Sequence, residues 1–238
     1  MKAFPAVTVP NIGFIQNLFE RLNNGEKIGY IKARLGKKNV SEALSILTYL
    51  GYVEGKGVGR NRRYYKRKTV LNLERDYMQK SDVELFLSTI ISETTNRRKL
   101  VEKIYGDRKE SNRTKMKRIT AIATLGRHLG IIRKGRAYKL TDKGKKELMR
   151  YVLEKVYTEL KKKYPVSYIP ISEVRREFLK EINLGREMFD QTLLELNNDG
   201  IIYLTTAPTT DEKSLKEGIA TSNGVFQHIR IDNFKYYG

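Results

Sequence analysis

The sequence predicts a mainly α-helical α+β fold, in which helices alternate with small β-hairpins in three consecutive units. Apolar residues recur three and four positions apart in most segments, which is the spacing of an amphipathic helix. Short apolar runs follow several of these segments and indicate strands. Gly51, Gly130 and Gly200 each stand between a predicted helix and such a run, 79 and then 70 residues apart. Three similar junctions indicate three similar units.

The first unit covers residues 1–80. Its apolar spacing predicts three helices, over 12–22, 28–35 and about 40–50. A hairpin begins at Tyr52, and its tip contains three glycines between Gly55 and Lys68. Seven cations and two tyrosines accompany these glycines. The segment from Leu71 to Lys80 is predicted to be a linker.

The second unit covers residues 81–144. Ser81 and Glu84 have the spacing of a capping box at the start of a helix over 81–95. Two more helices are predicted, one around 100–105 and one that begins at Ser111 or Asn112. Gly130 is expected to end the second of them in a left-handed conformation. The run 131–141 then predicts a tight hairpin that turns at Gly135.

The third unit, residues 145–238, is the most divergent. A long helical pattern over 142–164 has an apolar stripe wide enough for two neighbours. It indicates either a connecting helix shared by the second and third units or a dimer helix. The remaining elements are a short strand at 168–171, a helix capped by Ser172, a helix at 184–198, and strands at 201–204 and 225–231 joined by a long polar connection.

The formal charge of +20 is unevenly distributed along the chain. Residues 1–80 carry +10, residues 81–141 carry +9, and residues 142–238 carry only +1. A positive field confined to the first two thirds predicts a surface for a polyanion there, followed by a segment with another role. In the helix after Ser111, the residues Arg113, Lys117, Thr120 and Thr124 recur opposite the apolar face, where they can reach phosphates and base edges.

Other function classes are disfavoured by composition. Cysteine is absent, which excludes disulfides and thiolate metal sites. The only histidines, His128 and His228, have no clustered carboxylates, so neither a metal nor another cofactor is expected. The glycine-rich tip lacks the Gly-Lys-Ser/Thr of a phosphate-binding loop. The sequence has no signal peptide and no run of 18 apolar residues. We therefore expect a cytoplasmic location and no association with a membrane.

The run YKLTDKG, from Tyr138 to Gly144, resembles the end of the wing and the start of the next helix in winged-helix regulators. Nearly the whole chain resembles tandem winged helix-turn-helix DNA-binding proteins of the archaeal and bacterial type, which implies three consecutive winged-helix-like domains. In that family the third helix enters the major groove and the wing follows the backbone. The resemblance thereby assigns DNA contact to Lys37, Lys38, Ser41, Ser45, Thr48, Lys56, Arg60, Arg62, Arg63, Lys66, Arg113, Lys115, Lys117, Arg118, Thr120, Thr124, Arg133, Lys134 and Arg136.

The expected function is double-stranded DNA binding by a sequence-specific, nucleoid-associated transcription regulator. The alternative is a DNA-binding component of a replication, segregation or defence system. The helix at 184–198 bears acidic residues on its outward face, which would repel phosphate, so residues 145–238 are expected to bind a protein partner or a second copy. A phosphodiester-cleaving enzyme using Tyr64 or Tyr65 is a third hypothesis, but the metal-binding acids it needs are missing, and no enzyme is expected.

Overall fold

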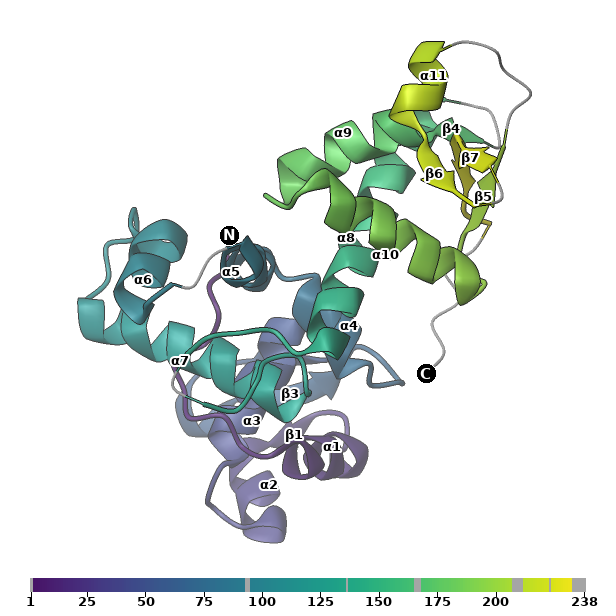
Figure 1. Ribbon diagram of the computed structural model, residues 1–238. Helices are drawn as coiled ribbons and strands as arrows, with labels where there is room; N and C mark the ends of the chain where they lie inside the picture. Colours follow the sequence, from purple (N-terminus) through teal and green to yellow (C-terminus); the bar gives the residue numbers. More distant parts are fainter. Residues whose placement is uncertain are drawn as a thin grey trace. The chain divides into compact units, whose positions relative to one another are not determined.

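The computed structural model describes residues 2–92, 95–135, 137–164, 168–206, 212–222 and 224–232. The chain is mainly helical with small antiparallel sheets, in agreement with the predicted class (Figure 1). It divides into two compact units, unit 1 over residues 1–144 and unit 2 over residues 145–238. A further division of unit 1 at residue 80 stays a prediction. Within the described ranges, no helix combines the length and the apolar character needed to cross a membrane.

The first half of unit 1 consists of three helices and a three-stranded sheet. The elements are α1 (Ile12–Arg21), β1 (Glu26–Lys27), α2 (Ile28–Leu35), α3 (Val40–Leu50), β2 (Val53–Lys56), the 3₁₀ turn η1 (Gly59–Asn61) and β3 (Arg63–Lys66). β3 lies between β1 and β2 and is antiparallel to both, so that Tyr64 is opposite Glu26 and Gly55. The three predicted helices agree with these bounds, whereas β1 was not predicted.

The second half of unit 1 begins with α4 (Leu73–Met78), where a linker was predicted. The linker prediction was wrong because the apolar residues of this segment are core residues. Leu73, Tyr77 and Met78 are buried. The Tyr77 hydroxyl donates a hydrogen bond to the carbonyl oxygen of Ile122 at 2.9 Å. α4 is therefore held against α7 within the second half of unit 1.

The described part of unit 1 continues with the helices α5 (Ser81–Ser92), α6 (Arg97–Tyr105) and α7 (Asn112–His128). Ser111 caps α7, since its hydroxyl accepts a hydrogen bond from the backbone N–H of Thr114 at 3.2 Å. Gly130 follows the helix with φ 74°, as expected, and Gly51 and Gly200 take φ 90° and 68° at the two equivalent junctions. The internal repeat of helix, glycine and apolar run is thus a repeat of local structure.

The hairpin predicted at 131–141 is present in short form, as one antiparallel bridge between Ile132 and Leu140. The backbone N–H groups of Arg133 and Thr141 donate to the carbonyl oxygens of Lys139, at 2.8 Å, and Ile131, at 2.9 Å. Side chains add to this short ladder. The guanidinium of Arg127 donates to the carbonyl oxygens of Arg133, at 3.3 Å, and of Gly135, at 3.0 Å. These bonds hold the described part of the loop against the end of α7.

Residues 2–10, which we call the N-terminal strap, run between the two halves of unit 1 (Figure 1). Phe4 is fully buried, and its ring lies 4.9 Å from that of Tyr49 on α3. Its carbonyl oxygen accepts a hydrogen bond from Arg118 on α7. At the other end of the strap, the carbonyl oxygen of Pro10 lies 3.1 Å from Nδ1 of His128. The strap is therefore part of the core.

Asp82 on α5 is the polar centre of unit 1 and is only 5% exposed. Its carboxylate accepts hydrogen bonds from the backbone N–H of Phe4 at 2.6 Å and from the hydroxyl of Tyr105 at 2.7 Å. The hydroxyl of Tyr49 is a third donor. One buried carboxylate thus joins the strap, α3, α5 and α6.

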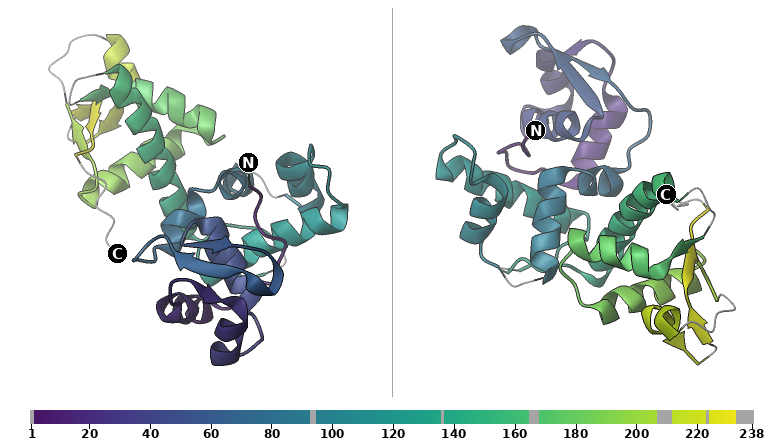
Figure 2. Two further views of the ribbon diagram at one scale, coloured as in Figure 1. Left: turned by 180° about the vertical axis from the view of Figure 1, so that it is seen from behind. Right: turned by 90° about the horizontal axis from the view of Figure 1, so that it is seen from above.

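The described part of unit 2 contains three longer helices and two small sheets, which lie together at one end of the helices (Figure 2). The elements are α8 (Asp142–Lys163), which begins in unit 1, β4 (Ile169–Pro170), α9 (Ile171–Glu181), α10 (Arg186–Asn198), β5 (Tyr203–Thr205), α11 (Glu212–Glu217), β6 (Ile219–Thr221), β7 (Gly224–Phe226) and β8 (His228–Arg230). The sheet orders are β4-β8-β5 and β6-β7. α9 begins at Ile171 after Pro170, so Ser172 is not its cap.

Candidate nucleic-acid interface

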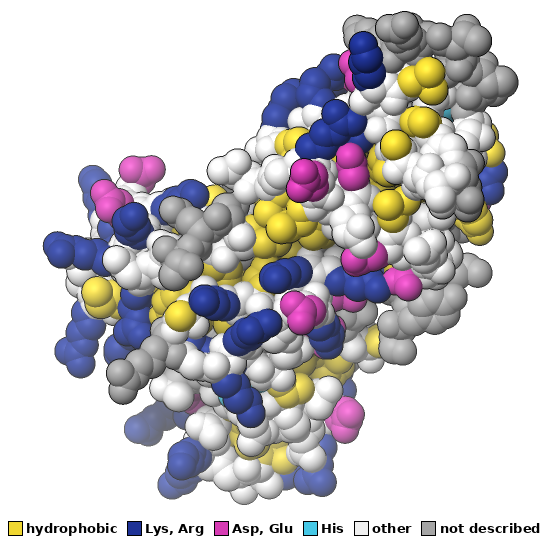
Figure 3. Space-filling view, in the orientation of Figure 1, with side chains coloured by type: hydrophobic (Ala, Val, Ile, Leu, Met, Phe, Trp, Pro, Cys, Tyr) yellow, Lys and Arg dark blue, Asp and Glu magenta, His cyan; other side chains and the backbone are white. Residues whose placement is uncertain are grey.

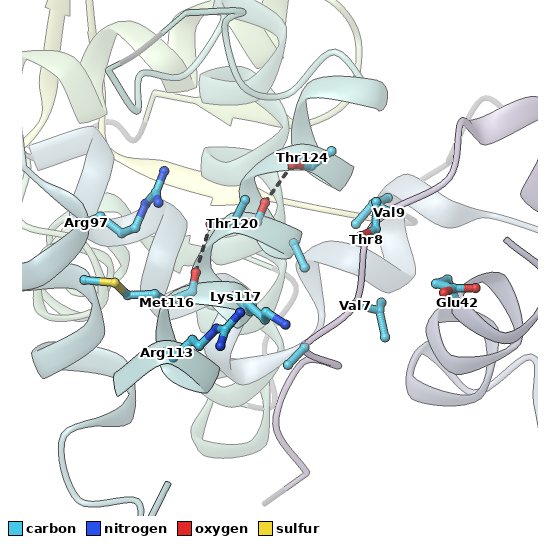
Figure 4. Close-up of a pocket in the computed structure, with 12 residues that line it drawn as sticks. Val7, Thr8, Val9, Glu42, Arg97, Arg113, Met116, Lys117, Thr120 and Thr124 are labelled. Carbon is cyan, nitrogen blue, oxygen red and sulfur yellow. Dashed lines mark hydrogen bonds between the residues drawn. The ribbon is translucent and has the colours of Figure 1, made fainter. Parts of the chain in front are cut away.

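The polar face of α7 borders an open groove of about 720 Å³ in unit 1 (Figure 4). Arg113, Lys117, Thr120 and Thr124 project from one side of this helix, because they are spaced by about one turn. Arg97 of α6 lies on the same side, while the opposite wall is formed by residues 6–9 of the strap and by α3. The full lining is Ala6, Val7, Thr8, Val9, Glu42, Arg97, Arg113, Met116, Lys117, Thr120, Ala121 and Thr124.

The side chains of this groove are suited to a polyanion. Arg113 and Lys117 are exposed, and neither has an ion-pair partner within the described ranges. The hydroxyls of Thr120 and Thr124 donate to the carbonyl oxygens of Met116 and Thr120 at 2.9 and 2.8 Å, which leaves their oxygens able to accept. Glu42 is the one carboxylate in the lining, against three cations. The groove thus offers positive charge beside hydroxyl and methyl groups.

Two residues of α7 that were expected to contact DNA are held inside unit 1. Lys115 is 7% exposed, and its ammonium donates to the carbonyl oxygen of Gly106 at 3.0 Å. Arg118 forms a paired contact with the carboxylate of Glu110, at 2.9 and 3.0 Å, besides its bond to the strap. That hydrogen bond holds the pKa of Glu110 below its ordinary value. Lys115 and Arg118 therefore position α7, and we leave them out of the proposed interface.

The face of α3 that the resemblance assigned to DNA contact is only partly open. Ser41, Ser45 and Thr48 are half-buried, and the hydroxyl of Ser45 donates to the carbonyl oxygen of Ser41 at 2.8 Å. The beginning of the strap, together with Ser45 and Thr48, lines a second, smaller pocket. Lys37 and Lys38, which precede α3, are exposed.

The β2–β3 hairpin carries the second group of cations. Lys56, Arg60 and Arg63 are exposed, and Arg63 donates to the carbonyl oxygen of Gly25 at 2.9 Å. Lys66 is half-buried, and its ammonium donates to the carbonyl oxygen of Glu20 at 3.1 Å. The hairpin therefore presents cations at its tip and anchors others at its base.

Beyond α7, Arg133 and Lys134 are exposed on the loop that follows Ile132, and Arg133 is 3.9 Å from the carboxylate of Asp142. Arg136 lies outside the described residues. Figure 3 shows Lys and Arg side chains spread over the parts of unit 1 formed by α2, α6 and α7. The predicted site residues thus fall into two groups, one on α7 and its loop and one on the α2–α3 turn and the hairpin.

Tyr64 does not have the properties of a nucleophile. It is buried, and burial raises the pKa of its hydroxyl, an effect that the neighbouring charge of Arg62 partly offsets. The reactive phenolate is therefore disfavoured. Within the described ranges, no group of three His, Cys, Asp or Glu side chains is arranged to hold a metal ion.

Three features of the interface were missed in the sequence. Arg97 belongs to the run Arg97-Arg98-Lys99, whose charge was visible but whose orientation was not. Lys2 lies near α3 only because Phe4 is anchored in the core. The strap itself has no local signal, since its partners are far away in the sequence.

No family model, curated protein sequence or solved structure matches the chain at a significant level.

Proposed function

We propose that the protein binds double-stranded DNA through unit 1 and acts as a sequence-specific transcription regulator. The observation that carries this proposal is the polar face of α7, where Arg113, Lys117, Thr120 and Thr124 line an open groove. A helix of this kind can place its cations on phosphates and its shorter side chains on base edges.

The order of elements in the first half of unit 1 supports a winged-helix interpretation. Three helices are followed by the β2–β3 hairpin, and the short strand β1 before α2 completes a sheet of order β1-β3-β2. In such a domain α3 is the recognition helix and the hairpin is the wing. The exposed cations Lys56, Arg60 and Arg63 are then wing contacts to the DNA backbone.

The charge of the chain supports the same partner. Residues 1–144 carry +19 of the formal +20, and residues 145–238 carry +1. A positive field of this size attracts a polyanion and makes its binding strongly dependent on salt. In unit 2, Asp190 pairs with Arg175 at 2.6 Å and with Arg186 at 3.4 Å, so this residue does not form the acidic outward face that was expected of α10. The low net charge of unit 2 is what makes a protein partner or self-association the better proposal for it.

The first test is a titration of the full chain with fluorescently labelled random duplex, single strand and RNA at low ionic strength. We expect the duplex to bind most tightly. The double variant Arg113→Ala/Lys117→Ala should lose at least about tenfold in duplex affinity, since each contact to a base or phosphate contributes roughly 1 kcal/mol or more. A chain that ignores duplex DNA under these conditions overturns the proposal.

The matched control is Lys103→Ala/Lys109→Ala, which removes the same charge from exposed positions of unit 1 outside the groove. Equal losses in both double variants would mean that the α7 face is not the interface.

A genome-wide pull-down then tests the regulatory role. Bound sites concentrated at promoters support it, and sites concentrated at origins or repeats contradict it.

A further inference from the structure

A second pocket, of about 310 Å³, lies between the strap, α3 and the β2–β3 hairpin. Its lining contains two cations and lacks a carboxylate. The lining residues are Lys2, Ala3 and Pro5 of the strap, Leu44, Ser45, Thr48 and Tyr49 of α3, and Arg62 and Tyr64 of the hairpin. Each of the three walls therefore comes from a different part of unit 1.

Arg62 is folded back into the protein, unlike the exposed Arg60 nearby. Its guanidinium lies across Gly55, where any side chain would collide with it, and is 5.4 Å from the centre of the Tyr64 ring. Its Nε–H is buried and has no hydrogen-bond acceptor. Arg62 also has no ion-pair partner within the described ranges. The positive charge of Arg62 is thus held at the pocket, and no acidic side chain of the described residues neutralises it.

A second unsatisfied polar atom lies at the same pocket. The hydroxyl oxygen of Thr48 is buried and has no hydrogen-bond partner in the described structure. Buried polar atoms are almost always hydrogen-bonded, so two exceptions that line one pocket point to an acceptor from outside the chain. A guanidinium and an ammonium beside such an atom select an anionic acceptor.

We propose that this pocket binds the phosphate group of a small ligand, with Arg62 as the main donor and Lys2 and Thr48 as further contacts. A guanidinium matches two phosphate oxygens at once, and an ammonium from another direction suits a third. The volume is at the lower end of the range for small-molecule sites, which favours inorganic phosphate or a phosphorylated metabolite with a short carbon body.

The phosphate of a DNA backbone has the same chemistry, so the experiment separates the two sources. The full chain is titrated calorimetrically with inorganic phosphate and with glycerol phosphate, at an ionic strength kept constant with chloride. The variants are Arg62→Ala, Thr48→Val and the matched control Arg60→Ala, which removes an equal charge from the exposed hairpin tip.

We expect saturable binding in the wild type and in Arg60→Ala, at least tenfold weaker binding in Arg62→Ala, and a loss of several-fold in Thr48→Val. Thr48→Val removes one hydroxyl from a helix and keeps the side-chain shape, so it tests the site if Arg62→Ala fails to fold. The proposal is overturned by the absence of saturation up to about 10 mM, or by equal affinity in the wild type and Arg62→Ala.

The phosphate titration stands apart from the proposed function. Saturable phosphate binding that Arg62→Ala removes supports this site even if the chain ignores duplex DNA. Conversely, a chain in which Arg62→Ala weakens only duplex binding, while free phosphate does not bind, overturns the small-ligand site and assigns Arg62 to the DNA backbone.

Discussion

The backbone N–H of Phe4 donates a hydrogen bond to the carboxylate of Asp82 at 2.6 Å, across 78 residues of sequence. Because Tyr49 and Tyr105 donate to the same carboxylate, this contact joins the strap to helices from both halves of unit 1. The strap in turn forms a wall of the α7 groove and of the smaller pocket. The geometry of both candidate sites therefore depends on a buried acid that belongs to neither.

Asp82→Asn should destabilise unit 1 by about 2–4 kcal/mol, because an amide has only one acceptor oxygen and presents an N–H₂ to a hydroxyl donor. Urea unfolding of the full chain, followed through tyrosine fluorescence, measures the loss. The control Asp107→Asn makes the same change at an exposed position and should cost less than about 0.5 kcal/mol. Similar stabilities for the two variants would contradict the central role of Asp82.

Stability should fall in alkaline solution. Burial and the nearby charge of Asp82 raise the pKa of both Tyr49 and Tyr105 above the ordinary value of 10.0. A pKa that is raised in the folded state gives stability that is fully present below the unfolded pKa and is lost as pH rises towards the folded pKa. The free energy of unfolding should therefore decline above about pH 10.

The variants Tyr49→Phe and Tyr105→Phe identify the residues responsible. Each should be less stable than the wild type at pH 8, since a bond to Asp82 is lost, and each should show a shallower decline above pH 10. Unfolding free energies measured at several alkaline pH values provide the comparison. An unchanged slope in both variants would assign the decline to other groups.

Gly126→Ala should destabilise the protein by roughly 1–3 kcal/mol, although alanine is the better helix former. A methyl group at this position of α7 would lie 2.6 Å from Cδ1 of Ile132 and 2.7 Å from the hydroxyl of Tyr77. The control is Gly29→Ala in α2, where no atom lies within 4 Å of the added carbon. This change should be neutral or stabilising by up to about 1 kcal/mol. The thermal midpoints of the two variants should move apart, and a common rise would refute the close packing at Gly126.

Arg60→Ala/Arg63→Ala should flatten the dependence of log K on log salt concentration by about two units, since each phosphate contact releases about 0.9 of a counterion. Duplex titrations between about 50 and 200 mM salt give the slope. The charge-conserving variant Arg60→Lys/Arg63→Lys should keep the wild-type slope. A slope that does not change on alanine substitution removes the hairpin tip from the interface.

Local patterns predicted most of the helices of unit 1. The apolar spacing within α3 and the glycine after it are properties of neighbouring residues, so the bounds of α3 agree with the expectation. α4 was missed because it is short and because the partner of Tyr77, the carbonyl of Ile122, lies 45 residues away. The hairpin predicted at 131–141 has only one bridge, and the contacts of Arg127 that support it could not be foreseen from the alternation of the sequence.

The residues of the candidate site also divide into those that local sequence patterns predict and those that they do not. The face formed by Arg113, Lys117, Thr120 and Thr124 follows from helical periodicity, and it lies along a groove that the sequence did not predict. The winged-helix resemblance assigned Lys115 to the same contact, but a position two residues from Lys117 points to another side of the helix, where it is buried. The strap lay beyond sequence reasoning, because neither its position nor its partners follow from the residues next to it.

The contact between Phe4 and Arg118 spans 114 residues, which has a consequence for synthesis on the ribosome. The strap leaves the exit tunnel long before α7 has been made, so the carbonyl oxygen of Phe4 is without its donor Arg118 until that helix has emerged. Contacts that close such long loops also form slowly. Unit 1 therefore finishes folding late in synthesis, although its individual helices are local structures that form early.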